Sequence, residues 1–220
     1  MISLVITGTD TGVGKTWVGR VLSHALVAAG RRVVAVKPVE TGCGNPGSQL
    51  EDGALLAAAT GQAEPRAALH RFAAPVAPAL AAEREGETID LDALVLQIEA
   101  LSTGAEVLLV EGAGGLLSPI TWEWTIVDLA RSLGAAALVV AADRLGTINH
   151  AQLTLSALEL SGLEVVGIVL TPPETADEST GTNASAIARL SGLERVLALP
   201  RENDPSAAAA AIAPVVGWMG

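Results

Sequence analysis

The chain has 220 residues, 50% of them hydrophobic and only 2% aromatic, which predicts a core built from aliphatic side chains. This length fits one α/β domain covering residues 1–220 more easily than two domains. The formal net charge of −11 argues against nucleic-acid binding, because such a surface needs a basic patch. The single cysteine, Cys43, excludes an intramolecular disulfide and a cysteine-cluster metal site, and it favours a cytoplasmic location.

The first residues predict neither a signal peptide nor a membrane anchor. Apolar residues 2–6 lead straight into a glycine-rich turn, without the basic segment and cleavage site of a secretory signal. The longest apolar stretches, such as residues 133–142, are far shorter than a bilayer span. We therefore expect a protein without a membrane-bound part.

Short apolar runs alternate with helical periodicity along the chain. The pattern predicts strands at 2–6, 33–36, 106–110, 135–141, 165–170 and 196–199. Between and after them it predicts helices from 15 to about 30, at 52–60, 78–84, 91–101, 127–133, 147–161 and 184–190, and a terminal helix. The remainder of residues 62–88 is predicted to be irregular, and residues 41–49 and 171–182 are predicted to be polar loops. This alternation predicts a three-layer α/β fold, with a parallel sheet flanked by helices.

The strongest motif is Gly8-Thr-Asp-Thr-Gly-Val-Gly-Lys-Thr16, which lies between the first predicted strand and the first predicted helix. Strand, glycine-rich turn and helix form the context of a phosphate-binding loop, as in P-loop NTPases. The turn and the helix N-terminus offer backbone N–H groups to an anion. Lys15 is placed to reach the β- and γ-phosphates, and the Thr16 hydroxyl to bind Mg²⁺. The alternative is a glycine-rich turn with an exposed lysine, which position and flanking elements disfavour.

Three further polar motifs follow predicted strands: Lys37-Pro-Val-Glu-Thr41, Glu111-Gly-Ala-Gly-Gly115 and residues 143–149. Ligands of an open parallel sheet bind beyond the carboxyl ends of its strands, so these motifs are expected to share one crevice. Glu111 is a candidate magnesium ligand rather than a solvated strand end. Asp52 fits either a metal ligand or ordinary helix capping. For Lys37, a role beside phosphate and an exposed strand end are equally compatible with the spacing.

Taken together, these motifs resemble those of the dethiobiotin synthetases, the ATP-dependent cyclo-ligases of biotin synthesis. The matching segments are Thr7–Thr16, Lys37-Pro-Val with Thr41, Val110–Gly115 and Gly146-Thr-Ile-Asn-His150. The five residues between Gly8 and Gly14, one more than the general phosphate loop has, are this family's own form. The match runs from residue 1 to about residue 170 and becomes loose beyond it.

The resemblance implies a homodimer that joins CO₂ to 7,8-diaminopelargonate with ATP and Mg²⁺, binding neither nucleic acid nor membrane. Lys37 would be the catalytic lysine together with Lys15, and Mg²⁺ would be held by Thr16, Asp52 and Glu111. The nucleotide would contact Gly12, Val13, Gly14, Lys15, Thr16, Trp17, Asp52, Glu111, Gly112, Ala113, Gly114, Thr171, Pro172, Pro200, Arg201 and Glu202. The diamine would contact Thr11, Thr41, Gly115, Asn149 and His150, the last two across the dimer interface.

Two positions depart from the family pattern or leave its alignment open. Thr171-Pro172-Pro173 stands where many members carry an asparagine that reads adenine, and prolines offer no backbone N–H. A relaxed nucleotide preference is therefore a hypothesis. Asp52 follows a loop of variable length, so Glu51 is the alternative second metal carboxylate.

A nucleotide-driven switch or partitioning ATPase of the related deviant phosphate-loop type is the alternative function. Members of that class carry an extra lysine early in the loop, where this chain has Asp10. The absence of that lysine argues against the switch.

Overall fold

The computed structural model describes residues 1–44 and 51–219, so residues 45–49 of the predicted polar loop lie outside the described part. Its main sheet has the strands β1 (Ile2–Gly8), β2 (Val33–Val36), β5 (Val107–Glu111), β6 (Ala136–Ala142), β7 (Val165–Thr171) and β8 (Val196–Ala198). They lie in the order β2-β5-β1-β6-β7-β8, and each neighbouring pair is parallel. The predicted parallel α/β fold is confirmed.

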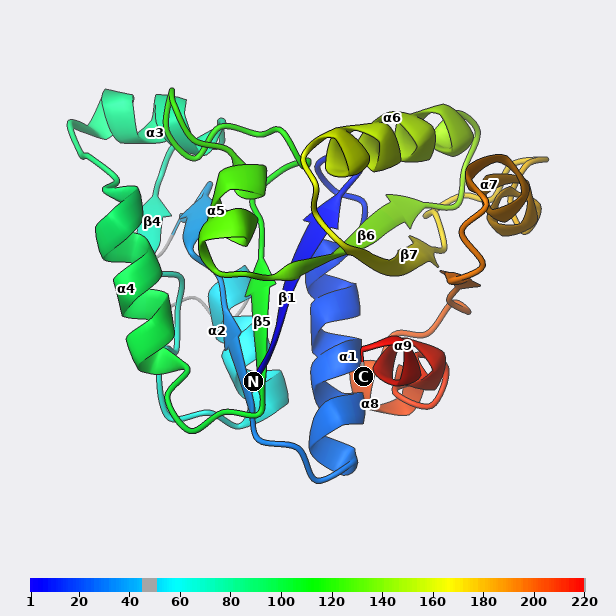
Figure 1. Ribbon diagram of the computed structural model, residues 1–220, viewed down its shortest axis with the longest axis horizontal. Helices are drawn as coiled ribbons and strands as arrows, with labels where there is room; N and C mark the ends of the chain where they lie inside the picture. The colour runs from blue at the N-terminus through cyan, green and yellow to red at the C-terminus, as the bar shows by residue number, and fades with distance from the viewer. Residues whose placement is uncertain (45–50, 220) are drawn as a thin grey trace.

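The helices are α1 (Lys15–Ala28), α2 (Asp52–Thr60), α3 (Pro78–Glu85), α4 (Leu91–Leu101), α5 (Ile126–Ser132), α6 (Thr147–Leu160), α7 (Asn183–Ser191), α8 (Pro205–Ala208) and α9 (Ala213–Trp218). They cover the sheet on both sides (Figure 1). Because successive strand residues point to opposite faces, Leu4 and Ile6 pack with α1 and α2, whereas Val5 packs with α4 and α5. A third apolar cluster joins β6 and β7 to α6 and α7.

The register of the central strands brings the sequence motifs to one edge. Ile6 of β1 lies opposite Glu111 of β5, and Val36 of β2 lies opposite Val110. Lys37, which follows Val36, is therefore level with Glu111, and both lie near the turn that follows β1. In Figure 1 the arrows of β1, β2 and β5 all end at the upper edge of the sheet.

Two short strands were not predicted. β3 (Val39–Thr41) pairs in parallel with β4 (His70–Phe72) as a separate two-stranded sheet. The prediction that residues 62–88 are irregular apart from one helix was therefore wrong at β4. The three residues of β3 and of β4 do not form an apolar run, and the segment around β4 is rich in proline and alanine.

The C-terminal tail was predicted as one helix, and this was also wrong, because α8 and α9 are separate. Pro214 lies in the first turn of α9, where its missing N–H is tolerated, but it cannot continue a helix that arrives from α8. Asp90 caps the N-terminus of α4, since its carboxylate accepts a hydrogen bond of 3.0 Å from the Ala93 N–H.

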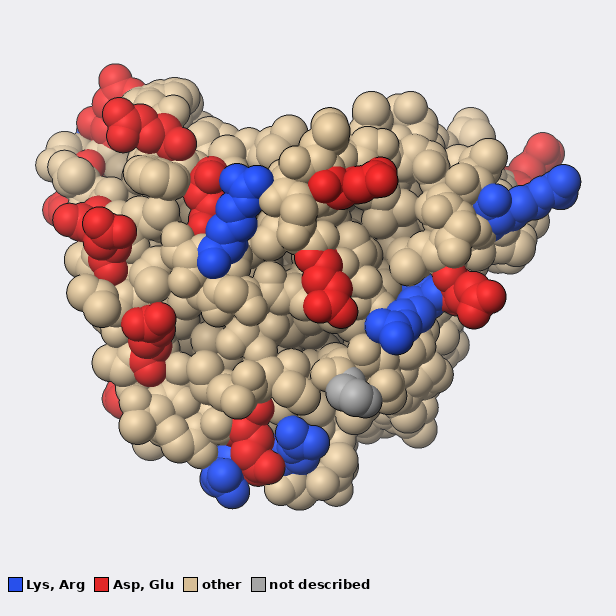
Figure 2. Space-filling view, in the orientation of Figure 1, with Lys and Arg blue, Asp and Glu red and all other residues tan. Residues whose placement is uncertain are grey.

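On the face shown in Figure 2, acidic side chains gather over the α3 and α4 end, while Lys and Arg side chains are scattered. Within residues 1–44 and 51–219, none of the helices combines the length and the hydrophobicity needed to span a bilayer.

Candidate active site

The phosphate-binding loop curls tightly between β1 and α1. Gly12 and Gly14 have φ angles of 72° and 90°, which L side chains rarely adopt, so glycine is required at both positions. A Cβ on Gly14 would also lie 2.9 Å from the Thr171 Cγ2 atom. The Thr9 N–H donates to the Val140 carbonyl at 2.9 Å and fixes the start of the loop against β6.

The far side of the loop is held by the end of β7. The Thr171 hydroxyl is buried and donates to the Val13 carbonyl at 2.8 Å. Thr171 and Val13 were both predicted to contact nucleotide, and the structure brings them together as a support for the loop. The Lys15 ammonium turns back over the loop and donates to the Asp10 carbonyl at 3.1 Å.

Four predicted site residues meet in one hydrogen-bonded cluster beneath the loop. The Thr16 hydroxyl lies 2.7 Å from Asp52 Oδ1 and 2.8 Å from Glu111 Oε1. Lys37 Nζ lies 2.7 Å from Asp52 Oδ2 and 2.6 Å from Glu111 Oε1. These side chains come from α1, α2, β5 and the residue after β2, so the fold joins segments that are far apart in the sequence.

Burial and neighbouring charges shift the proton affinities in this cluster. Burial, aided by the Lys37 cation, lowers the pKa of Lys15 to about 8. Burial also acts to lower the pKa of Lys37, but the carboxylates of Glu111 and Asp52 outweigh it and raise that pKa above its ordinary value. Burial raises the pKa of Glu111, and the Lys37 ammonium opposes this rise. Lys37 is therefore held as a cation between the two carboxylates.

The donor set fits a magnesium ion, which prefers hydroxyl and carboxylate oxygens. Thr16, Asp52 and Glu111 supply such oxygens within hydrogen-bonding distance of one another. Glu111 Oε2 is buried and has no hydrogen-bond partner among the described residues, so one strong acceptor is left for a cation.

The structure separates the two carboxylates that the sequence left as alternatives. Asp52 reaches Thr16 and Lys37, as described above. Glu51 instead accepts hydrogen bonds from the Arg71 guanidinium at 2.6 and 2.8 Å. Asp52 is thus the carboxylate of this pair that the fold brings to the candidate metal site.

A cavity of about 340 Å³ opens above the cluster. It is lined by Thr11, Gly12, Gly14, Lys15, Thr16, Lys37, Glu40, Thr41, Asp52, Glu111, Ala113 and Gly114. Gly112, which was also predicted, contributes its carbonyl, which accepts from Lys37 Nζ at 3.4 Å. This cavity joins the phosphate loop to the predicted catalytic lysine.

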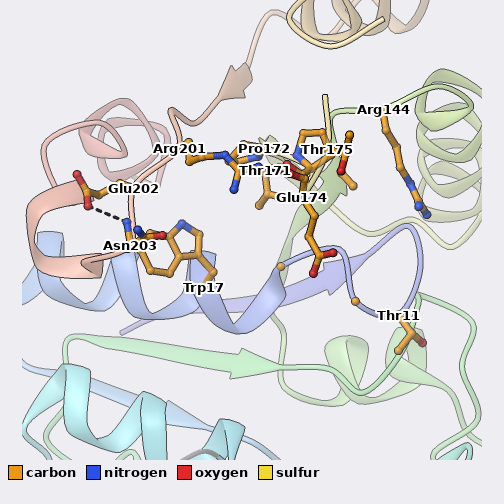
Figure 3. Close-up of a pocket in the computed structure, with 14 residues that line it drawn as sticks. Thr11, Trp17, Arg144, Thr171, Pro172, Glu174, Thr175, Arg201, Glu202 and Asn203 are labelled. Atoms are coloured by element: carbon orange, nitrogen blue, oxygen red, sulfur yellow. Dashed lines mark hydrogen bonds between the residues drawn. The ribbon is translucent and has the colours of Figure 1, made fainter. Parts of the chain in front are cut away.

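A second cavity of about 580 Å³ adjoins the first, and Thr11, Gly12 and Gly14 line both. Its other lining residues are Trp17, Ala142, Arg144, Thr171, Pro172, Pro173, Glu174, Thr175, Arg201, Glu202 and Asn203. Figure 3 shows the Trp17 indole beside Asn203, with Pro172 and Arg201 on the facing side. The Arg201 guanidinium donates to the carbonyls of Pro173 and Glu174 and so links two segments of this wall.

Several residues of this cavity were not predicted from the sequence. Arg144, Glu174, Thr175 and Asn203 line it but were not among the expected nucleotide contacts. Asn203 directly follows the predicted Arg201-Glu202 pair, so a wider window on that turn would have included it. Arg144 follows the end of β6, the position at which parallel strands present ligand contacts.

The loop after β7 is anchored by two aspartates, Asp143 and Asp177, whose role no sequence motif indicates. Asp143 is buried and accepts hydrogen bonds from Asn183 Nδ2 at 2.7 Å and from the Gly181 N–H at 2.9 Å. Asp177 accepts from the Leu145 N–H at 2.8 Å and from the Ser179 hydroxyl at 2.6 Å. These hydrogen bonds to its ionised form hold the pKa of Asp177 at about 2.

A third cavity of about 450 Å³ lies on the other side of the loop, between α6 and the Gly115 turn. It is lined by Thr9, Asp10, Thr11, Gly115, Leu116, Leu117, Ser118, Pro119, Leu153, Thr154 and Ala157. Asn149, His150 and Pro200 were predicted to be site residues, but they line none of the three cavities. Asn149 and His150 are exposed on the first turn of α6.

The chain is similar to known proteins over most of its length. A family described as an AAA domain matches residues 3–209. The ATP-dependent dethiobiotin synthetase BioD of Anaeromyxobacter dehalogenans strain 2CP-C is 46% identical over 220 residues, which cover 98% of this chain and 97% of the relative. The enzyme of the same name from Aquifex aeolicus is 41% identical over 201 residues, with 91% of this chain and 90% of the relative covered.

Chloroplast FtsY from Physcomitrella patens is similar in fold alone, with a TM-score of 0.57 and 18% identity over 96% of this chain and 64% of that structure. The parallel sheet and the glycine-rich loop define a P-loop nucleotide-binding fold. Within that class, the chain belongs to the dethiobiotin synthetase family, and it is a ligase.

Proposed function

We propose that the protein uses ATP to join CO₂ to 7,8-diaminopelargonate and to close the ureido ring, which yields dethiobiotin, ADP and phosphate. The proposal is supported by the relatives of the chain, which are ATP-dependent dethiobiotin synthetases. The observation that carries it is the position of Lys37. Its ammonium contacts the carboxylates of both Asp52 and Glu111. Both carboxylates also accept a hydrogen bond from the hydroxyl of Thr16, the residue that follows the phosphate-loop lysine.

The chemistry requires three bond-forming steps. One amine of the substrate attacks CO₂ and loses a proton, which gives a carbamate. A carbamate oxygen then attacks the γ-phosphorus of ATP, and ADP leaves. The second amine attacks the carbonyl carbon of this mixed anhydride, loses a proton and expels phosphate.

The residues of the cluster neutralise charge during these steps. Lys37 lies buried at the end of β2 and faces the cavity, where it would meet the carbamate and the transferring phosphoryl group. Lys15 and the backbone N–H groups of residues 12–17 would bind the phosphates. Thr16, Asp52 and Glu111 would hold Mg²⁺, which supplies positive charge to the β- and γ-phosphate oxygens.

The base and ribose of the nucleotide would occupy the 580 Å³ cavity, because it adjoins the phosphate loop on the side away from Lys37. Pro172 and Pro173 offer no backbone N–H there, and Trp17 offers an indole face. Stacking tolerates every base, so we propose a relaxed nucleotide preference. Comparing turnover with ATP, CTP and GTP tests it, and a strong preference for ATP would reject it.

The diamine would lie on the other side of the loop, where Thr11 and Gly115 line the 450 Å³ cavity. Thr41 lines the cavity that holds Lys37 and would contact the reacting amines. We propose that the enzyme is a homodimer in which Asn149 and His150 of α6 bind the substrate carboxylate of the other subunit. Their exposure at a helix N-terminus supports this role.

We further expect a cytoplasmic enzyme.

A phosphate-release assay tests the proposal. The protein is incubated with Mg²⁺, nucleotide, bicarbonate and diaminopelargonate, and each component is omitted in turn. Phosphate release should require all four, and dethiobiotin should form in equal amount. Release that proceeds unchanged without the diamine would reject the ligase and favour the nucleotide-driven switch.

A further inference from the structure

Glu40 is a buried carboxylate in β3 that the proposed reaction does not use. Its side chain lies at the edge of the cavity that contains Lys37, and the residue is 7% exposed. Glu40 Oε1 accepts a hydrogen bond of 2.6 Å from the Asp52 N–H, and Oε2 accepts one of 3.0 Å from the Gly53 N–H. Both oxygens are thus engaged by the first two residues of α2.

The N-terminus of α2 depends on this carboxylate for its capping. The first N–H groups of a helix have no partner within the helix and need an external acceptor. Glu51 occupies the cap position but makes no side-chain cap hydrogen bond, because its carboxylate is bound by Arg71. Glu40, twelve residues before Asp52 in the sequence, provides the acceptor instead.

The same contact fixes the direction in which the Asp52 side chain leaves the backbone. With its N–H held by Glu40, Asp52 directs Oδ1 to Thr16 at 2.7 Å and Oδ2 to Lys37 at 2.7 Å. The helix start has little freedom to shift, since a Cβ on Gly53 would lie only 2.3 Å from the Ala68 nitrogen.

We propose that Glu40 is a positioning residue for the magnesium site, which holds the backbone of Asp52 so that its carboxylate faces Thr16 and the metal. This inference rests on the proposed function, because the magnesium role of Asp52 is part of it. The competing explanation is that Glu40 only stabilises α2. The two explanations differ in what they predict for metal affinity once the protein is folded.

The test uses Mn²⁺ as a spectroscopic substitute for Mg²⁺. Binding of Mn²⁺ is measured by electron paramagnetic resonance in the presence of a non-hydrolysable ATP analogue and without diamine. In Glu40→Gln, one of the two N–H groups of α2 faces the amide NH₂, which cannot accept a hydrogen bond. The Mn²⁺ affinity should fall about tenfold, within the range for groups that orient metal ligands. Glu51→Gln is the matched control, because it changes the neighbouring carboxylate and weakens the Arg71 pair. It should change the affinity less than twofold.

A double-mutant cycle establishes whether Glu40 acts through Asp52. If it does, Glu40→Gln should cause no further loss of Mn²⁺ affinity in an Asp52→Ala background. Unchanged affinity in folded Glu40→Gln, or two losses that add fully, would overturn the proposal. If Glu40→Gln does not fold, Glu40→Asp replaces it with the same expectation, because its shorter side chain cannot reach both N–H groups. The assay involves no turnover, so it fails or succeeds independently of dethiobiotin formation.

Discussion

Replacing Lys37 with alanine should destabilise the protein in a way that a divalent cation reverses. The ammonium lies 2.6 Å from Glu111, whose side chain is 1% exposed, and 2.7 Å from Asp52, whose side chain is 34% exposed. Without Lys37, two carboxylates face each other in a cluster in which one of them is buried. Removing one partner of a buried ion pair costs about 3–5 kcal/mol.

We expect a loss near the lower end of that range, about 3 kcal/mol, because Asp52 is partly solvated and Glu111 can take up a proton. For a protein of this length, the loss corresponds to a melting temperature lower by about 6–12 °C. The difference in free energy of unfolding between Lys37→Ala and the wild type should be smaller at acidic pH. The pKa of Glu111 is raised by burial, so its ionised form is penalised in the folded state. That penalty is present at neutral pH and is relieved as the pH falls through the raised value.

Thermal unfolding followed by circular dichroism, with and without Mg²⁺, checks this prediction. Mg²⁺ should stabilise Lys37→Ala more than the wild type, because the ion replaces a missing positive charge. Lys37→Met controls for the lost side-chain volume and should behave alike. Turnover should fall at least about 100-fold. Equal stabilisation of variant and wild type by Mg²⁺ would refute the charge argument, and near-normal turnover would remove Lys37 from catalysis.

Three further variants probe other parts of the molecule. Trp17→Ala should weaken binding of ATP, CTP and GTP alike by about tenfold in calorimetric titration, because an indole can stack on any base. Asn183→Ala removes a 2.7 Å hydrogen bond to buried Asp143, and it should cost about 2 kcal/mol and speed proteolysis within residues 171–182. Gly53→Ala should cost about 3 kcal/mol in chemical unfolding, because the new methyl group would meet the Ala68 backbone.

Each of these three predictions has a control or an outcome that would contradict it. Tripolyphosphate has no base, so its affinity should not change in Trp17→Ala. If the variant lost as much affinity for tripolyphosphate as for the nucleotides, the effect would lie in the phosphate loop. Proteolysis of Asn183→Ala at the wild-type rate would show that the loop does not depend on this contact. Gly217→Ala is the partner for Gly53→Ala, since a Cβ at Gly217 in α9 would meet no described atom within 4 Å, and alanine in a helix should leave stability unchanged or raise it by up to about 1 kcal/mol. Similar unfolding curves for Gly53→Ala and Gly217→Ala would refute the steric argument.

Much of the fold follows from local sequence patterns. The β-branched run at residues 33–36 and the apolar run before Glu111 are long enough to reveal buried strands, and both are present as β2 and β5. Their parallel pairing also follows from the intervening helices. β3 escaped prediction because three residues after Pro38 carry no periodicity, and its partner strand lies about thirty positions further along the chain.

The candidate site was predictable where a motif carries its own geometry. The glycines around Lys15 indicate a phosphate loop by themselves, and residues at strand ends are expected to converge at one edge of the sheet. The choice between Asp52 and Glu51 was not predictable, because it depends on Arg71 and Glu40, which approach α2 from a separate small sheet. Long-range contacts of this kind leave no trace in local spacing.

The strand order also bears on how this enzyme can change. Glu111 ends β5, Lys37 follows β2 and Thr16 lies in the first turn of α1, and all three line the cavity above the cluster, whereas Pro172, Trp17 and Arg201 line the other cavity. The residues proposed to act in bond formation and those proposed to contact the base thus line different cavities, which share only residues of the phosphate loop. We therefore expect that mutations in residues 172–175 and 201–203 can alter the choice of nucleotide while the ligase chemistry stays intact. The two properties are open to separate selection and to separate engineering.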